Sequence, residues 1–80
     1  MDEAAILSRL NALFREIFDN VSLVLSPETA AADVPGWDSM THITIVVEVE
    51  RRFGVKFQTS EIETLRDIGD FLALIGKKTG

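Results

Sequence analysis

The chain contains no cysteine and only one histidine among its 80 residues. The missing thiols exclude disulfides, thiolate metal sites and cysteine nucleophiles. A single imidazole is too few for a site built on nitrogen ligands, so we expect the protein to hold no metal. Its stability must then come from the packing of side chains.

The chain also lacks any apolar run that approaches the ~18 residues of a membrane-spanning helix. Its opening stretch, MDEAAILSRL, carries acids where a secretory signal would carry bases. We therefore expect a cytoplasmic protein that makes no contact with a membrane.

Positive charge is scarce, because 8 Lys and Arg stand against 13 Asp and Glu, which gives a formal net charge of −5. This balance opposes binding to a phosphate backbone, so we expect no nucleic-acid partner. Residues 1–38 hold seven acids and two bases, whereas residues 39–80 hold six of each. Any long-range attraction toward basic partners would come mainly from the first half.

What is present is the composition of an ordinary folded protein, 46% apolar and 26% charged. A chain of this size fits one domain, which buries only about 60 to 65% of the surface of the unfolded chain. We expect residues 1–80 to form a single domain with a thin core and no deep, enclosed active site.

Apolar residues at spacings of three and four predict an amphipathic helix over about residues 3–19. The predicted buried stripe comprises Ile6, Leu7, Leu10, Leu13, Phe14, Ile17, Phe18 and Val21. A long connection over residues 20–38 follows, and it contains both prolines of the chain. A loop of that length needs anchoring or a function, so we expect Leu23 and Leu25 to reach the core.

The next segment, MTHITIVVEVERRF, is dense in β-branched residues, which favour a strand. Its alternation is poor, however, and on a helical wheel four apolar residues share an arc of about 100°. These residues are Ile45, Val46, Val49 and Phe53. Two arginines and a glycine close the segment, as is typical of a helix C-terminus. The pattern therefore predicts a helix over about residues 39–53.

Two successive Ser/Thr-x-x-acid patterns predict two more helix starts, at Ser60 and at Thr64. The first predicts a short helix over about residues 60–63. The second predicts a helix over about residues 65–75 that stops at Gly76, followed by a frayed C-terminus. Together these elements predict an all-α fold, a small four-helix bundle of three main helices and one short helix with a long first loop.

The stretch PGWDSM lies directly before the predicted helix of residues 39–53. Asp38 or Ser39 could cap that helix by accepting a hydrogen bond from one of its first amides. Ser39 could instead be a point of covalent attachment, because a helix N-terminus favours an added phosphodiester. Trp37 would then fix the direction of the serine, or it could fill the core.

A hydrolytic triad of Asp38, Ser39 and His42 is a third interpretation of the same stretch. It requires a serine–imidazole hydrogen bond, a group that orients the imidazole and an oxyanion hole in a water-poor pocket. A protein this small offers no obvious pocket, so we expect no catalysis.

A second apolar stripe, formed by Met40, Ile43 and Val47, lies away from the core-facing arc of the same segment. A helix in the middle of a bundle could bury both stripes. If the second stripe is exposed instead, it offers a surface on which a protein partner docks.

Three stretches carry a resemblance to a known family. They are GWDSM at residues 36–40, the apolar run that follows His42, and ERRFGVKF at residues 50–57. In these stretches the chain resembles the acyl carrier proteins, which commonly read Asp-Ser-Leu, an apolar helix, then Glu, two residues and Phe. The order of the predicted elements is similar over essentially the whole chain.

This resemblance implies a carrier, which is not an enzyme. A phosphopantetheinyl transferase would attach 4′-phosphopantetheine from coenzyme A to Ser39. The thiol of that arm would hold acyl or aminoacyl groups as thioesters, which explains why the chain needs no thiol of its own. Gly36, Trp37 and Asp38 would support the attachment point.

The helix after the serine is the usual recognition element of that family. The resemblance implies that Met40, Ile43 and Val47 contact a loading enzyme and synthase enzymes, and that the carrier is a monomer. The alternative is a small helical interaction adaptor that presents the same stripe, with Ser39 only as a helix cap.

The chain departs from fatty-acid carriers in two ways. These carriers bear several acids along the recognition helix, whereas here only Glu48 and Glu50 are acidic. Met40 stands where leucine is usual, a swap that conserves volume. Both features are more typical of a discrete carrier of a specialised polyketide or nonribosomal-peptide pathway.

Overall fold

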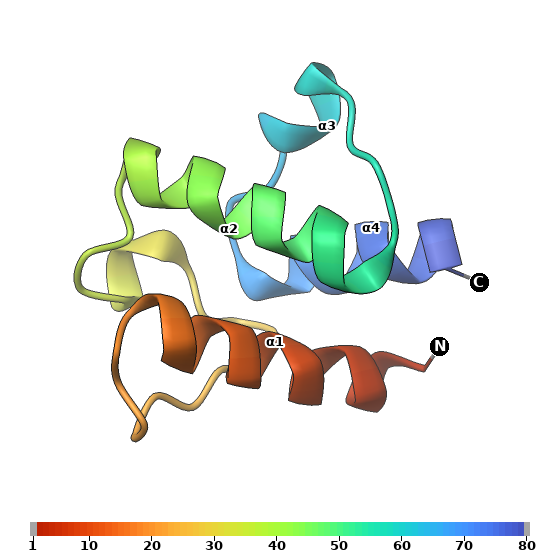
Figure 1. The fold of residues 1–80 in the computed structure, drawn as a ribbon. Coiled ribbons are helices and arrows are strands. Elements are labelled where there is room, and N and C mark those ends of the chain that lie inside the picture. Colours follow the sequence, from red (N-terminus) through yellow and green to blue (C-terminus); the bar gives the residue numbers. More distant parts are fainter. Residues whose placement is uncertain (1, 80) are drawn as a thin grey trace.

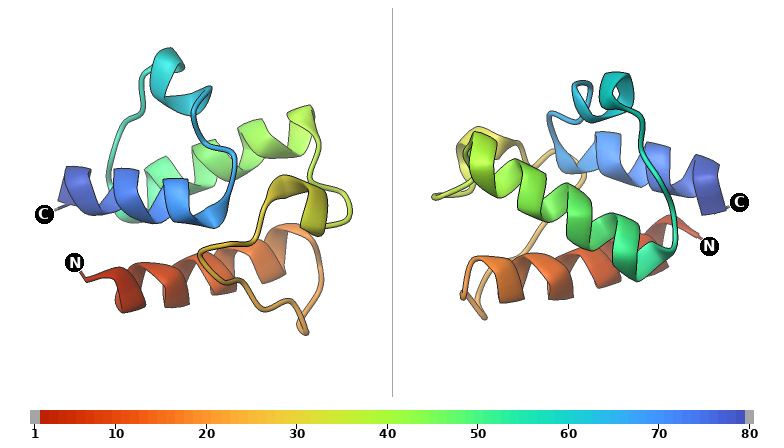
Figure 2. Two further views of the ribbon diagram at one scale, coloured as in Figure 1. Left: turned by 180° about the vertical axis from the view of Figure 1, so that it is seen from behind. Right: turned by 45° about the horizontal axis from the view of Figure 1, so that its top comes forward.

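A computed structural model describes residues 2–79, and within them every regular element is a helix. The elements are α1 (Glu3–Ile17), the 3₁₀ turn η1 (Ala31–Asp33), α2 (Ser39–Phe53), α3 (Thr59–Ile62) and α4 (Ile68–Thr79). α1 packs against both α2 and α4, and the short α3 lies on the side of the bundle away from α1 (Figure 1). The end of α4 lies beside the start of α1 (Figure 2). The predicted all-α bundle of three main helices and one short helix is confirmed.

α1 begins where the sequence predicts and ends slightly earlier. The Asp2 carboxylate caps it by accepting a hydrogen bond from the Ala5 amide at 2.8 Å. The helix stops at Ile17, because Asp19 takes a left-handed conformation with a φ of 49°. Val21 consequently lies outside the buried stripe and is 87% exposed, so its predicted burial is wrong.

The loop between α1 and α2 is held down by side chains and by polar contacts. Leu25 is buried and Leu23 is half-buried against the core, as predicted. The Asn11 side chain accepts a hydrogen bond from the Leu25 amide at 2.8 Å, and Arg15 Nε donates to the Leu23 carbonyl at 2.7 Å. Polar groups of α1 therefore satisfy backbone groups that the loop leaves unpaired.

α2 spans the predicted range in spite of its β-branched residues. The Asp38 carboxylate caps its start by accepting a hydrogen bond from the Thr41 amide at 2.9 Å. Gly54, with a φ of 67°, caps its end and donates its N–H to the Glu50 carbonyl. The buried residues of this helix are Ile45, Val46 and Val49. Burial of one apolar face thus outweighs the strand preference of the individual residues.

α3 begins one residue before the predicted start, and its cap differs from the predicted one. The Glu61 carboxylate accepts a hydrogen bond from the Gln58 amide at 2.8 Å. Gln58 is therefore the residue at the N-cap position, and Ser60 lies inside the helix. The prediction that Ser60 opens this helix is wrong by that shift.

α4 begins at Ile68, so the prediction that Thr64 opens it is wrong. The Thr64 hydroxyl instead donates to the Glu61 carbonyl at 2.7 Å, at the end of α3. The start of α4 is held by a reciprocal pair of acids. Asp67 accepts from the Asp70 amide at 2.9 Å, and Asp70 accepts from the Asp67 amide at 3.3 Å. The second acid of this pair takes the place that Glu or Gln holds in a capping box.

The end of α4 is also later than predicted, because the helix continues through Gly76 to Thr79. Lys78 Nζ lies 3.0 Å from a carboxylate oxygen of Glu61, and the Thr79 hydroxyl donates to the Ile75 carbonyl at 2.8 Å. The ion pair ties the last turn of α4 to α3, and the helix forms in spite of a glycine that costs about 1 kcal/mol. The predicted fraying is wrong for residues 77–79, and the last residue lies outside the described part of the chain.

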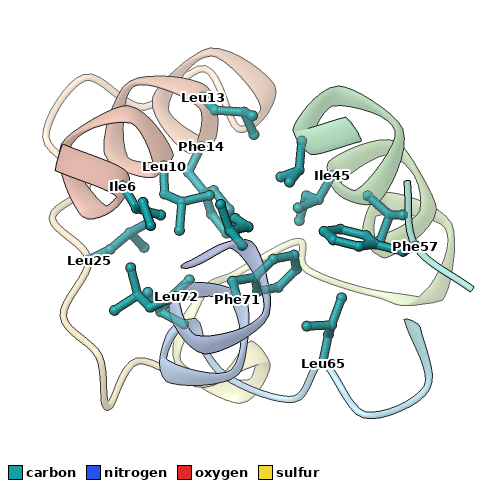
Figure 3. Packing of buried hydrophobic residues seen from close by; sticks show 14 of the residues in the cluster. Ile6, Leu10, Leu13, Phe14, Leu25, Ile45, Phe57, Leu65, Phe71 and Leu72 are labelled. Atoms are coloured by element: carbon teal, nitrogen blue, oxygen red, sulfur yellow. The ribbon is translucent and has the colours of Figure 1, made fainter. Parts of the chain in front are cut away.

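The core lies between α1, α2 and α4, where Phe14, Phe71 and Ile45 point toward one another (Figure 3). The rings of Phe14 and Phe71 meet edge to face, with centroids 6.4 Å apart. Trp37 joins them from the loop, with its ring centroid 5.2 Å from that of Phe14. Trp37, two residues before the start of α2, is thus part of the core.

Candidate functional site

Ser39 is the first residue of α2 and is exposed. Asp38 performs the capping, and the Ser39 hydroxyl makes no hydrogen bond within residues 2–79. The interpretation of Ser39 as the helix cap is therefore wrong, because the preceding aspartate takes that position. The serine hydroxyl is left free to react.

Two of the first backbone amides of α2 are also left without an acceptor among the described residues. The Thr41 amide donates to the Asp38 carboxylate and the His42 amide donates to the Asp38 carbonyl at 2.8 Å. The amides of Ser39 and Met40 have no such partner in residues 2–79. Unpaired amides at a helix N-terminus favour a negatively charged group, such as a phosphodiester on Ser39.

Asp38 keeps its negative charge beside the serine. Hydrogen bonds from the Thr41 backbone and side chain hold the pKa of Asp38 below its usual value. The carboxylate is therefore ionised at neutral pH and remains engaged with the first turn of α2.

Trp37 both fills the core and holds the start of α2. Its side chain is only 8% exposed, and its indole Nε1 donates to His42 Nδ1 at 3.1 Å. The two rings are stacked, with an interplanar angle of 17°. Gly36 precedes the tryptophan with a φ of 91°, a conformation that a side chain would strain. Trp37 therefore fills the core and also fixes the start of α2, the two roles that the sequence offered as alternatives.

The arrangement around His42 does not form a hydrolytic triad. His42 Nδ1 accepts from Trp37, and an imidazole that accepts at Nδ1 carries its proton on Nε2. Nε2 lies 3.5 Å from the Ile62 carbonyl at the end of α3. Neither nitrogen is hydrogen-bonded to Ser39, so the imidazole is not placed to activate that hydroxyl.

An open cleft of about 560 Å³ lies beside Ser39. Its lining residues are Ala31, Trp37, Asp38, Ser39, His42, Ile43, Ile62, Glu63, Leu65 and Arg66. The walls are mainly apolar, and the charged residues among them are one base, Arg66, and two acids, Asp38 and Glu63. A hydroxyl at the mouth, free amides and a partly apolar cleft together fit a phosphodiester that continues into a flexible arm.

No sequence pattern pointed to Ile62, Leu65 or Arg66 as residues that line a site. Ile62 is the last residue of α3, and Leu65 and Arg66 lie in the segment that joins α3 to α4. His42 reaches the end of α3 through its contact with Ile62. The positions of these lining residues depend on how α3 folds back over α2, which no spacing in the chain reveals.

The second apolar stripe of α2 is exposed along its length. The exposed fraction is 83% for Met40, 54% for Ile43 and 51% for Val47. Ile43 also lines the cleft, so the stripe continues from the mouth of the cleft along the outside of the helix.

Comparison with known proteins shows which family this chain resembles. The family model described as a phosphopantetheine attachment site matches residues 8–75. The chain is 28% identical over 75 residues to an acyl carrier protein of Thermotoga maritima, covering 94% of this chain and 93% of that protein. It is 31% identical over 78 residues to a meromycolate extension acyl carrier protein of Mycolicibacterium smegmatis, covering 92% and 79%.

A solved structure agrees. The solution structure of a holo acyl carrier protein from Geobacter metallireducens is 39% identical, with a TM-score of 0.84 over 90% of this chain and 83% of that one. The matched family model and the bundle shared with this structure define a small helical carrier with a covalently attached arm. The chain belongs to the acyl carrier proteins of the phosphopantetheine-attachment family.

The predicted carrier role and its cofactor are thereby confirmed, and the adaptor is the less favoured alternative. The protein holds acyl intermediates as thioesters on a covalent 4′-phosphopantetheine arm and presents them to other enzymes. Its partners include, in general, a phosphopantetheinyl transferase and acyl-handling synthase enzymes. Among the described residues, no helix has both the length and the apolar character needed to cross a membrane.

Proposed function

We propose that Ser39 is the residue that carries the phosphopantetheine arm. One observation carries this proposal: the Ser39 hydroxyl is exposed at the N-terminus of α2 and is not used as the cap, because Asp38 caps the helix. The free amides of the first turn and the adjoining cleft support the same assignment.

Gly36, Trp37 and Asp38 hold this hydroxyl in place. Gly36 permits the turn, Trp37 ties the loop to the core and to His42, and Asp38 starts the helix. When bound, the arm supplies the thiol that the chain lacks. No side chain of the described residues is hydrogen-bonded to the Ser39 hydroxyl, so the base that removes its proton comes from the transferase. Membership of a family of carriers supports the proposal that the chain itself is not a catalyst.

The remaining features of the proposal rest on the sequence and on the exposed stripe. Residues 1–80 act as one carrier domain, a monomer in the cytoplasm. Met40, Ile43 and Val47 contact the partner enzymes, since they expose apolar surface next to the cleft. The scarcity of acids on α2 supports a specialised polyketide or nonribosomal-peptide pathway, in which the cargo includes aminoacyl groups loaded by a dedicated enzyme.

Intact-protein mass spectrometry tests the attachment site. The apo protein is incubated with coenzyme A and a broad-specificity phosphopantetheinyl transferase, in parallel with Ser39→Ala and Ser60→Ala. Ser60 is a matched control, because it is also an exposed serine in the first turn of a helix. We expect the wild type and Ser60→Ala to gain one phosphopantetheine unit and Ser39→Ala to gain none. Modification of a folded Ser39→Ala sample would refute the assignment.

A further inference from the structure

The outer face of α2 carries no acid. Residues 40, 43, 44, 47 and 51 follow one another on this side at spacings that place them on one helical face. The face therefore consists of the three stripe residues, a threonine and, at the end farthest from Ser39, Arg51. The Arg51 side chain is 67% exposed.

Glu48 flanks this face, but its carboxylate is occupied by two arginines. Arg51 donates to it from two nitrogens, at 2.7 and 3.2 Å, and Arg52 Nε donates to it at 3.3 Å. Hydrogen bonds from Arg51 hold the pKa of Glu48 below its usual value, so the pairing is between full charges. Glu48 is only 22% exposed and offers little to a partner.

Glu50, the other acid of α2, is engaged in a hydrogen bond within the protein. Its carboxylate accepts a hydrogen bond from the Phe57 amide at 2.7 Å and so holds the segment after the helix. With two acids and two bases, α2 has no net charge of its own. The excess of negative charge lies in residues 1–38. The last of these residues, Asp38, accepts a hydrogen bond from the first turn of α2.

Charges on the neighbouring elements leave Arg51 as the charge at the end of the outer face farthest from Ser39. Glu61 of α3 is paired with Lys78, and Glu63 and Arg66 lie at the cleft beside Ser39. Arg52 is shared between Glu48 and Glu16 of α1. Arg51 is thus the charge that a partner meets when it covers the stripe from Ser39 outward.

We propose, on the basis that α2 is the docking helix of the proposed carrier, that its cognate enzymes present an apolar socket with a carboxylate opposite Arg51. The socket takes Met40, Ile43 and Val47, and the carboxylate pairs with the arginine N–H groups that Glu48 leaves unused. A docking patch rich in Lys and Arg does not fit, because it would face Arg51 with like charge and would find Glu48 already paired.

Two transferases of known docking surface test this inference, one with an apolar docking surface and one with a surface rich in Lys and Arg. The measured quantity is kcat/KM for loading of the apo protein, at ionic strengths from about 50 to 500 mM. For the wild type we expect the apolar enzyme to be about tenfold more efficient or better, with only the modest fall at high salt that one exposed ion pair gives. Circular dichroism of every variant checks that the fold is retained.

Charge variants sharpen the test. We expect the double variant Thr44→Glu, Arg51→Glu to raise kcat/KM with the basic enzyme by about tenfold at low salt, and this gain to vanish at high salt. Lys77→Glu, a charge reversal at an exposed residue of α4, is the control and should change neither rate by more than about twofold.

The outcomes separate this inference from the proposed function. Faster loading of the wild type by the basic enzyme, or a double variant that behaves as the control does, would overturn the docking inference and leave the attachment site intact. If neither enzyme loads a folded wild-type sample, the assignment of Ser39 itself fails and the docking inference fails with it.

Discussion

The two faces of α2 carry the same kinds of residue in opposite environments. Ile45 is fully buried whereas Ile43 is 54% exposed, and Val46 is 3% exposed whereas its neighbour Val47 is 51% exposed. The inner face packs on α1 and the core phenylalanines, and the outer face runs from the cleft beside Ser39 into solvent. Apolar character alone therefore does not separate the residues that hold the fold from those available to a partner.

The largest expected effect is on stability and comes from the inner face. Ile45→Ala should lower the free energy of unfolding by about 2 to 5 kcal/mol, because it opens a cavity in a packed core. Ile43→Ala, the matched change on the outer face, should cost no more than about 0.5 kcal/mol. Denaturant unfolding of both variants measures the difference. Equal losses would show that the two faces are not distinct.

The next effect is on docking and comes from the outer face. Val47→Glu should reduce kcat/KM for transferase loading by about tenfold or more, since it places a charge in an apolar contact. The helical circular dichroism should stay unchanged, because this side chain is half exposed. Val46→Glu, one residue away, should instead unfold the protein. Full turnover by a folded Val47→Glu variant would contradict the docking role of the stripe.

A smaller loss of stability is expected where the loop meets α2. His42→Phe keeps an aromatic ring beside Trp37 but removes the acceptor of its indole N–H, 3.1 Å away. Leaving that buried donor unpaired should cost about 1 to 3 kcal/mol in thermal or denaturant unfolding. Loading at Ser39 should persist at temperatures where the variant is folded. No loss of stability would mean that the Trp37–His42 bond does not hold the loop.

The smallest expected effect is a dependence on pH at the cap of α2. The pKa of Asp38 is lowered in the folded protein by its bonds to Thr41, so its contribution is present above the unfolded pKa, about 3.9. That contribution is lost as the pH falls through the lower folded pKa. Asp38→Asn caps without titrating. The wild type should therefore lose stability relative to Asp38→Asn below about pH 4. Parallel curves for the two proteins would contradict this assignment of the cap.

Much of the fold follows from periodicity, and the rest depends on contacts between distant residues. The stripes of α1 and α2 predicted which helices form and which faces are buried, because helical spacing is local. The start of α4 was misplaced, since Thr64 and Asp67 both fit a capping pattern and only the packing selects one. Backbone contacts from the loop take part in that choice, including the hydrogen bond from the Gly69 amide to the Pro27 carbonyl at 2.8 Å.

The site divides in the same way. The resemblance to the acyl carrier proteins implied Ser39 as the attachment point. The sequence could not decide between Asp38 and Ser39 as the cap, because both residues favour that position. It also could not place Ile62 and Arg66 beside the serine, since the path of α3 is not encoded in a local pattern. The pairing of Glu48 with Arg51 and Arg52 follows from helical spacing, whereas the hydrogen bond from the Phe57 amide to Glu50 depends on the path of the chain after α2.

The central claim is that the free hydroxyl at the head of α2 is the attachment point, and peptide-level mass spectrometry tests it most directly. The wild-type apo protein is loaded from coenzyme A, digested and fragmented to locate the added group. We predict phosphopantetheine on Ser39, within the peptide that contains PGWDSM, and on no other hydroxyl. The group on another residue, or no modification of a folded sample, would contradict the account.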